Sequence, residues 1–117
     1  MSPLVVLSGG KPYAGLGLPG GTRIVTVTTQ LAVNLIDFKA TPMKVVSSPR
    51  VHVEGKEPVQ LSSDAPERVA EALRKQGHTV ERIDAIGGEA NAVIVDSKSG
   101  AVQAAASGKS EGALVFR

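Results

Sequence analysis

Short apolar runs separated by turn residues make up most of this chain, a pattern that predicts many short elements rather than a few long ones. Residues 4–7 are a continuous run of strand-favouring apolar residues, and Ser8-Gly9-Gly10 supplies a turn before residues 11–17. We therefore predict a β-hairpin at the start of the chain.

The stretch from residue 22 to residue 37 carries a conflict between local propensity and periodicity. Its first half is rich in β-branched residues, which favour a strand. The larger apolar residues nevertheless recur at steps of three and four positions, which a strand would not produce. We therefore predict a buried helix over 22–37 with Thr22 as its N-cap. Its apolar positions are Ile24, Val27, Leu31, Leu35 and Phe38.

The middle of the chain is predicted to hold a short helix and two short strands. Thr41 and Pro42 fit an N-cap and a first helical position, and Pro49 ends that helix. Residues 51–53 and 59–61 have the composition of strands, and the charged residues between them suit a sheet edge.

A third helix is predicted to follow. Asp64-Ala65-Pro66-Glu67 resembles a capping box, and the helix that it starts runs to Gln76. Gly77 is its predicted left-handed stop. The predicted apolar stripe of this helix is Val69, Ala72 and Leu73.

Three closing strands are predicted over 79–83, 90–95 and 101–106, with a hairpin turn over 96–100. No internal repeat or low-complexity linker interrupts the pattern. The predicted fold class is α/β, more narrowly α+β. We expect a single domain over residues 1–117 in which helices pack on a mainly antiparallel sheet.

Composition narrows the classes of function. Thirteen Lys and Arg against eleven Asp and Glu give a formal net charge of +2, and the basic residues are scattered, so we expect no nucleic-acid partner. Cysteine is absent, which excludes a thiol nucleophile, a disulfide framework and a thiolate metal site. No apolar run approaches the roughly 18 residues of a membrane span, and any export signal would lie upstream, so the compartment stays open.

The strongest candidate for chemistry is Leu18-Pro19-Gly20-Gly21-Thr22-Arg23, between the predicted hairpin and the predicted long helix. Glycines carry no Cβ, so a ligand can approach their backbone N–H groups, and the helix dipole adds partial positive charge there. If acyl chemistry takes place nearby, an oxyanion would sit at Gly20 and Gly21. The other interpretation is a tight strand-to-helix turn without a ligand.

Two further motifs resemble phosphate-binding loops but fit poorly. Residues 15–20 spell G-x-G-x-x-G, but Pro19 stiffens the loop and Asp37 falls at the end of a helix rather than of a strand. Gly108-Lys109-Ser110 resembles the end of a phosphate-binding loop, yet Gln103 stands where that motif needs glycine. A dinucleotide- or phosphate-binding module is therefore only the second choice of function for this chain.

His52 and His78 are the only histidines. Neither has acidic residues at the spacing of a ligand set, so we expect packing or hydrogen-bonding roles and no metal.

Several segments also occur in an order that resembles a known family. Together they look like the later part of the small subunit of gamma-glutamyltranspeptidases, and the resemblance covers essentially the whole chain. The segments are Met1-Ser2-Pro3, Gly10-Lys11-Pro12, residues 17–24, Asn34-Leu35-Ile36-Asp37-Phe38, Ser48-Pro49-Arg50-Val51-His52, Gly77-His78-Thr79-Val80 and residues 90–96.

The resemblance implies an N-terminal-nucleophile hydrolase with a layered αββα sandwich. In such enzymes the freed N-terminal threonine of the small subunit attacks the γ-glutamyl carbonyl, and two glycine amides, at Gly20 and Gly21 in this sequence, form the oxyanion hole. That threonine, the serine pair that holds the substrate α-carboxylate and an arginine of the large subunit are absent from this chain. The implied acyl transfer needs no cofactor. Leu18 stands where many members have a small polar residue.

We therefore expect the C-terminal portion of a gamma-glutamyltransferase or hydrolase that acts on glutathione and other γ-glutamyl amides. Such a chain would be inactive alone and would need the large subunit and the N-terminal part of the small subunit as partner. The alternative is a stand-alone, non-catalytic domain or a truncated relative. Open sheet edges and apolar faces would make the isolated chain bind its missing part or self-associate.

Overall fold

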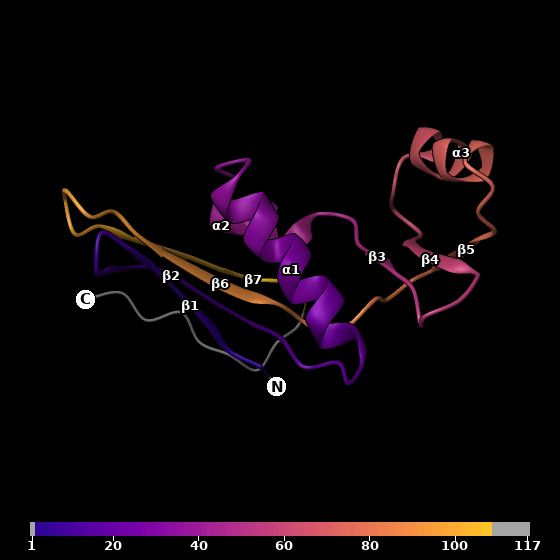
Figure 1. Ribbon diagram of the computed structural model, residues 1–117. Helices are drawn as coiled ribbons and strands as arrows, with labels where there is room; N and C mark the ends of the chain where they lie inside the picture. The colour runs from indigo at the N-terminus through magenta and orange to yellow at the C-terminus, as the bar shows by residue number, and fades with distance from the viewer. Residues whose placement is uncertain (1, 109–117) are drawn as a thin grey trace.

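The computed structural model describes residues 2–108, which form two sheets and three helices in an elongated body of 47 × 29 × 23 Å (Figure 1). The larger sheet has the strand order β1-β2-β6-β7, and the smaller has the order β3-β4-β5. None of the helices in this part of the chain is long and apolar enough to cross a membrane. The two sheets lie at opposite ends of the long axis, with α1 and α2 between them.

The larger sheet is antiparallel throughout and is built from two hairpins. The turn at Gly9 and Gly10 joins the first pair, and the 96–100 turn joins the second, where Asp96 Oδ1 accepts hydrogen bonds from the amides of Lys98 and Ser99 at 2.8 Å. Both predicted hairpins are therefore confirmed. The strands are β1 (Leu4–Ser8), β2 (Lys11–Gly17), β6 (Asn91–Val95) and β7 (Val102–Ala106).

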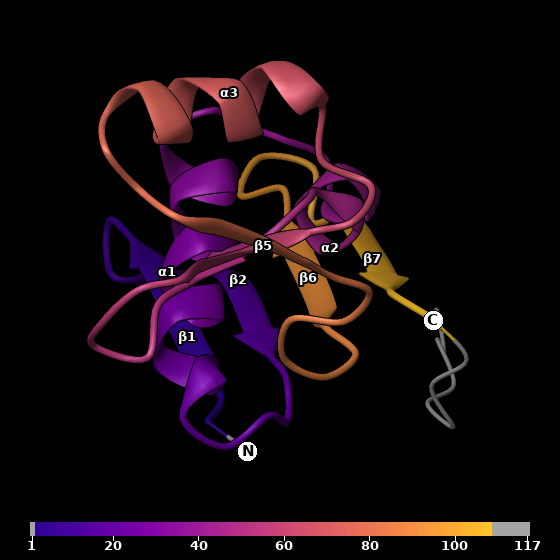
Figure 2. The same ribbon diagram turned by 90° about the vertical axis from the view of Figure 1, so that its right-hand side faces the viewer.

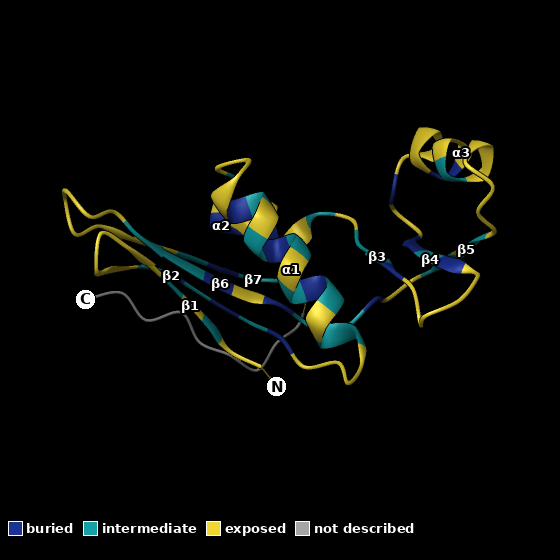
Figure 3. Ribbon diagram, in the orientation of Figure 1, coloured by how far each residue is buried: buried dark blue, intermediate teal, exposed yellow. Residues whose placement is uncertain are grey.

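One face of this sheet is covered by α1 (Arg23–Ile36) and α2 (Pro42–Ser47). The helix predicted from periodicity is confirmed, because burying Val27, Leu31 and Leu35 outweighs the strand preference of the β-branched residues. Figure 3 shows the alternation of buried and exposed residues along α1. The main core consists of Ala14, Leu16, Leu18, Val27, Leu31, Leu35, Val45, Val46, Ile86, Ala90, Ala92 and Ala105.

One detail of α1 was predicted wrongly, and a second was correct only in position. Phe38 is 74% exposed, because the helix ends at Ile36 and the chain turns away before the fifth apolar position can reach the core. Thr22 occupies the N-cap position, but its side chain makes no capping hydrogen bond. Its hydroxyl donates instead to Glu54. Thr41, by contrast, caps α2 as predicted, accepting a hydrogen bond from the amide of Lys44.

The smaller sheet contains β3 (Val51–His52), β4 (Val59–Ser62) and β5 (Val80–Ile83), and Figure 2 views the molecule from this end. Strands β4 and β5 are parallel and are joined through α3 (Glu67–Lys75), a βαβ crossover within an otherwise antiparallel fold. The edge position predicted for both early strands is correct for β3 and wrong for β4, which lies in the centre because β5 pairs with its free side.

The start and the buried face of α3 differ from prediction. The helix begins at Glu67 after Pro66, and no side chain caps it, so the predicted capping box does not form. Ala70 is its buried residue and Leu73 packs beside it, whereas Val69 and Ala72 are exposed. The stop after residue 76 is as predicted, with Gly77 at φ +94°.

No helix of residues 2–108 covers the other face of the larger sheet (Figure 1). Its strand register places Val5, Gly15, Val93 and Ala104 in one row across the four strands. Val5 is 69% exposed. In the part of the chain that the structure describes, the sheet therefore has one packed face and one open apolar face.

Candidate functional site

The two candidate glycines lie in the turn between the end of β2 and the start of α1. Their carbonyls are used by the helix, since the amides of Arg23 and Ile24 donate to Gly20 O and Gly21 O at 3.2 Å. Within residues 2–108, the amides of Gly20 and Gly21 themselves donate no hydrogen bond, and both residues are exposed. Two N–H groups are thus available to a ligand at the positive end of a helix.

Backbone geometry requires glycine at both positions. Gly21 has φ +59° in the left-handed region, with open space where a Cβ would be. Gly20 has φ +147°, and a Cβ there would come within 3.0 Å of Gly87 Cα and Gly88 N. The turn is therefore both conformationally unusual and tightly packed on one side.

A second glycine pair, Gly87-Gly88, provides that packing. The amide of Gly88 donates to Pro19 O at 2.8 Å, and a Cβ on Gly88 would lie 2.5 Å from Pro19 Cγ. In the sequence this pair lies between two of the predicted strands, 79–83 and 90–95. The doubled glycine is a sequence signal of close backbone approach, but its partner is 68 residues away in the chain, from Pro19 to Gly87.

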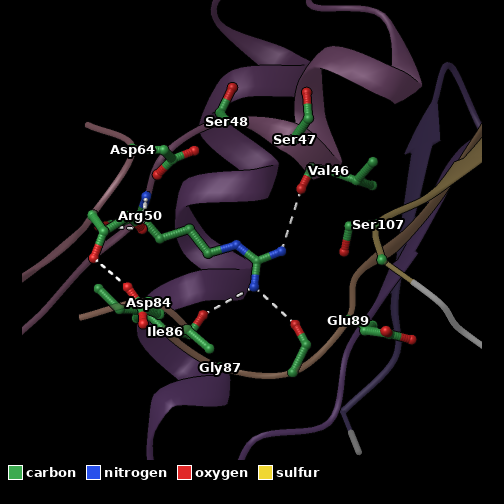
Figure 4. A pocket seen from close by; sticks show the side chains of 15 residues that line it. Val46, Ser47, Ser48, Arg50, Asp64, Asp84, Ile86, Gly87, Glu89 and Ser107 are labelled. Atoms are coloured by element: carbon green, nitrogen blue, oxygen red, sulfur yellow. Dashed lines mark hydrogen bonds between the residues drawn. The ribbon is translucent and has the colours of Figure 1, made fainter. Parts of the chain in front are cut away.

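The side chain of Arg50 holds the loop that carries this second pair (Figure 4). Its Nη1 donates to Ile86 O at 2.9 Å and to Gly88 O at 2.8 Å, and its Nη2 donates to Val46 O at 3.3 Å near the end of α2. Burial lowers the pKa of the Arg50 guanidinium from its usual value, and the nearby Asp64 carboxylate opposes that shift. Arg50 therefore serves as a fixed structural cation that joins α2 to the 86–88 loop.

A pocket of about 470 Å³ opens beside Arg50 (Figure 4). Its lining includes Gly87 and Gly88 but neither Gly20 nor Gly21. It is rich in serine hydroxyls and in carboxylates, and one of these, Asp84 Oδ1, accepts a hydrogen bond from Ser63 at 2.7 Å. Because three carboxylates line this pocket, those of Asp64, Asp84 and Glu89, and would repel an oxyanion, we place the candidate site at the Gly20-Gly21 turn instead.

Each of the two histidines lies beside a different carboxylate. His52 is 3% exposed; its Nδ1 lies 3.1 Å from Thr26 Oγ1, and its Nε2 lies 3.1 Å from Glu54 Oε1, close enough for an ion pair but poorly aligned as a hydrogen bond. His78 Nδ1 lies 2.7 Å from Glu57 Oε1. The expected hydrogen-bonding role is therefore observed. No group of three His, Asp or Glu side chains within residues 2–108 is arranged to hold a metal ion.

The G-x-G-x-x-G segment does not form a phosphate-binding loop. Gly15 and Gly17 lie inside β2, where Gly15 packs against Val93, and Asp37 follows the end of α1. Of the second phosphate motif, Lys109 and Ser110 lie outside the described residues.

Comparison with known proteins decides the family. A family model described as gamma-glutamyltranspeptidase matches residues 1–116. The chain belongs to the gamma-glutamyltranspeptidase family.

Some of its relatives are named acylases and others glutathione hydrolases. The chain is 36% identical over 115 residues to an acylase ACY 1 proenzyme of Pseudomonas sp. strain SE83, covering 98% of this chain and 20% of the relative. It is also 36% identical over 103 residues to a glutathione hydrolase proenzyme of Pseudomonas aeruginosa, covering 85% of this chain and 18% of the relative.

A solved gamma-glutamyltranspeptidase from Pseudomonas nitroreducens, in complex with L-DON, has a similar fold. Its TM-score is 0.83 at 33% identity, and the match covers 99% of this chain and 62% of that chain. This similarity confirms the α+β fold class of the family. The chain spans about a fifth of the length of the curated relatives that it matches.

Within this gamma-glutamyltranspeptidase family member, the structure adds three residues to the candidate site that the sequence analysis did not assign to it: Arg50, Gly87 and Gly88. Gly87 and Gly88 pack against the turn at Pro19 and Gly20, and Arg50 holds the loop that carries them.

Proposed function

We propose that this chain is the C-terminal part of a gamma-glutamyltransferase or hydrolase and supplies its oxyanion hole. The observation that carries the proposal is the pair of amides at Gly20 and Gly21, which are exposed at the N-terminus of α1 and donate no hydrogen bond within residues 2–108. Donors fixed in this way stabilise charge that develops on a carbonyl oxygen without having to reorganise during the reaction.

The proposed reaction is acyl transfer through a threonine supplied by the rest of the protein. The threonine hydroxyl oxygen bonds to the γ-glutamyl carbonyl carbon and gives up its proton, and the carbonyl oxygen becomes an oxyanion that accepts hydrogen bonds from Gly20 and Gly21. Collapse of this intermediate breaks the C–N bond, and the proton lost by the threonine hydroxyl ends on the leaving nitrogen, which is released as the amine. Water or an acceptor amine then attacks the acyl-threonine through the same intermediate geometry.

The open face of the larger sheet supports a large covering partner. That face carries a row of apolar side chains, and the outer edge of β1 pairs with no strand of residues 2–108. Folded domains normally cover both kinds of surface. We propose that a second sheet from the remaining part of the protein packs there and completes the αββα sandwich. In this interpretation residues 1–117 are one segment of that sandwich.

A second candidate is an acylase that cleaves an amide without a γ-glutamyl group. The relative named as an acylase matches this chain at 36% identity, the same value as the glutathione hydrolase of P. aeruginosa. Both reactions pass through an oxyanion, so the glycine pair serves either one equally. Comparing cleavage of glutathione with cleavage of a simple acyl amide by the assembled protein distinguishes the two.

The oxyanion role is tested with Gly21→Ala, for which Gly9→Ala is a matched control. Gly9 has φ +58° and Gly21 has φ +59°, and both have open space where a Cβ would be, so the backbone strain is the same. A methyl group at residue 21 obstructs the approach of the substrate carbonyl, and we expect kcat to fall about 100- to 1,000-fold, as for loss of an oxyanion donor. Equal kcat values for the two variants would refute the proposal.

A further inference from the structure

The first turn of α1 is tied to the smaller sheet through one carboxylate. Glu54 follows β3, and its Oε1 accepts a hydrogen bond from Thr22 Oγ1 at 2.9 Å. The same oxygen lies 3.1 Å from His52 Nε2. His52 Nδ1 in turn lies 3.1 Å from Thr26 Oγ1, one helical turn after Thr22. Two positions on one face of α1 are thus held by two residues of a single short segment.

The Thr22 side chain makes this contact in place of a capping hydrogen bond. The residue has helical φ and ψ angles of −61° and −27°, and its side chain makes no capping hydrogen bond. Threonine is a favoured N-cap residue, and a free cap would form in its usual extended conformation. The hydroxyl is aimed at Glu54 instead, so the orientation of the helix start depends on a residue 32 positions away.

The Glu54 carboxylate is kept ionised by the same contacts. The hydrogen bond from Thr22, followed by the close approach of the His52 ring, lowers the pKa of the Glu54 carboxyl from its usual value. His52 is 3% exposed, and burial fixes the imidazole between Thr26 and Glu54. The neighbouring Arg23 adds a further link, since its Nη2 donates to Gln60 Oε1 on β4 at 3.1 Å.

We propose that Glu54 is a positioning residue: together with His52 it holds Thr22 and thereby sets the direction of the Gly20 and Gly21 amides. Thr22 directly follows Gly21, and the first amides of α1 donate to the carbonyls of both glycines. A shift of the helix start therefore turns the peptide units that carry the two free N–H groups. This inference rests on the proposed oxyanion role.

Glu57 offers a matched control in the same loop. It also pairs with one histidine and one threonine, through His78 Nδ1 at 2.7 Å and the amide of Thr79 at 2.9 Å, and it also has a lowered pKa. Its contacts connect the segment before β4 to the segment before β5, and neither of its partners belongs to α1. Glu54→Gln and Glu57→Gln therefore remove equal charge from similar settings, and only Glu54 contacts Thr22, the residue that follows the glycine pair.

The kinetic test compares Glu54→Gln, Thr22→Val and Glu57→Gln in the assembled, active protein. We expect the first two variants to lower kcat about tenfold with KM unchanged, because misdirected donors weaken transition-state binding only. The double variant Thr22→Val/Glu54→Gln should lose no more than either single variant. Loss of kcat in Glu57→Gln to the same extent would overturn the proposal, since it would indicate a general effect of charge or stability.

A second measurement separates this inference from the oxyanion role. In the full chain labelled with ¹⁵N-glycine, purified with its partner where it has one, Glu54→Gln and Thr22→Val should shift the amide resonances of Gly20 and Gly21, and Glu57→Gln should not. Unshifted resonances would overturn the positioning role. Shifted resonances with an unchanged kcat would instead overturn the oxyanion role on which the inference rests.

Discussion

Glycine is required at the candidate site for two different physical reasons. Gly21 is required by its positive φ, whereas Gly88 is required by space, because a Cβ would meet Pro19. Gly20 is subject to both constraints. The second glycine pair thus allows the 87–88 segment to lie against the turn that carries the exposed amides of Gly20 and Gly21.

Gly88→Ala tests the packing constraint alone. A Cβ at this position would lie 2.5 Å from Pro19 Cγ and 2.6 Å from Pro19 O, so we expect about 1–3 kcal/mol of destabilisation from overpacking. Gly17→Ala is the control, because a Cβ there has nothing within 4 Å. Urea unfolding of the full chain measures both, and equal unfolding free energies for the two variants would contradict the close approach.

Arg50→Lys tests the arginine that joins α2 to the 86–88 loop. Lysine cannot reach Val46 O, Ile86 O and Gly88 O at once, so we expect a loss of about 2–3 kcal/mol, the size of a lost hydrogen bond to a charged group. Arg68→Lys changes an exposed arginine of α3 and should leave the unfolding free energy within about 0.5 kcal/mol. A stable Arg50→Lys variant would mean that the loop is held by other contacts.

At the scale of elements, polar contacts hold the smaller sheet to its neighbours. The side-chain amide of Gln30 pairs with β3 like an added strand, accepting from Val51 N at 2.9 Å and donating to Val51 O at 2.8 Å. At the far side, Glu67 on α3 accepts from Arg74 and from Arg82 of β5 at 2.7 Å. These contacts fix the edge of the sheet and the crossover where little apolar area is buried.

Glu67 should make stability depend on pH in the acid range. Hydrogen bonds from Arg74 and then from Arg82 lower its pKa in the folded state. Its contribution is therefore complete above the ordinary carboxyl pKa of 4.5 and is lost as the pH falls through the lower folded-state value. Thermal unfolding from pH 6 to pH 3 should show a smaller decrease in Tm for Glu67→Gln than for the unmodified chain.

An exposed glutamate of the same helix, Glu71, provides the comparison for this experiment. Glu71→Gln should retain the acid dependence of the unmodified chain. An identical decrease in Tm for the Glu67 and Glu71 variants would show that the ion pairs across α3 and β5 contribute nothing measurable.

Local signals predicted the elements well and their faces less well. Both hairpins and the stops of the helices follow from turn residues, and α1 follows from its apolar period, because these signals act within a few residues. The buried face of α3 was missed because Ala70 is covered by a parallel strand pair that only the tertiary fold creates. The N-cap position of Thr22 was predicted correctly, but its side chain makes no capping hydrogen bond, because the hydroxyl donates to Glu54, 32 positions away.

The residues of the candidate site also divide into those that local sequence predicts and those that depend on the tertiary fold. Gly20 and Gly21 stand out in the sequence because two adjacent glycines precede a periodic segment. The contribution of Arg50 could not be predicted, since two of its acceptors lie 36 and 38 positions away and are backbone carbonyls that any residue type provides. Sequence thus located the exposed donors but not the contacts that hold them.

At the scale of the whole molecule, the apolar face that residues 2–108 leave open should determine whether the isolated chain self-associates. We expect the isolated chain to self-associate, and the double variant Val5→Lys/Val102→Lys to restore a monomer of 12.0 kDa, because these exposed residues lie on that face. Met43→Lys, on the exposed side of α2, should leave the association unchanged. Sedimentation velocity measures all three, and a monomeric unmodified chain would contradict the proposed covering partner.

The central claim is that residues 1–117 complete the active site of a gamma-glutamyl transferase or hydrolase. The most direct test is the native mass of this chain isolated from its own cells, with its companions identified by mass spectrometry and the preparation assayed for cleavage of glutathione. We predict that the chain is recovered together with a polypeptide that begins with a threonine, and that the preparation cleaves glutathione. Recovery of the chain alone or only with copies of itself, without cleavage, would contradict the claim.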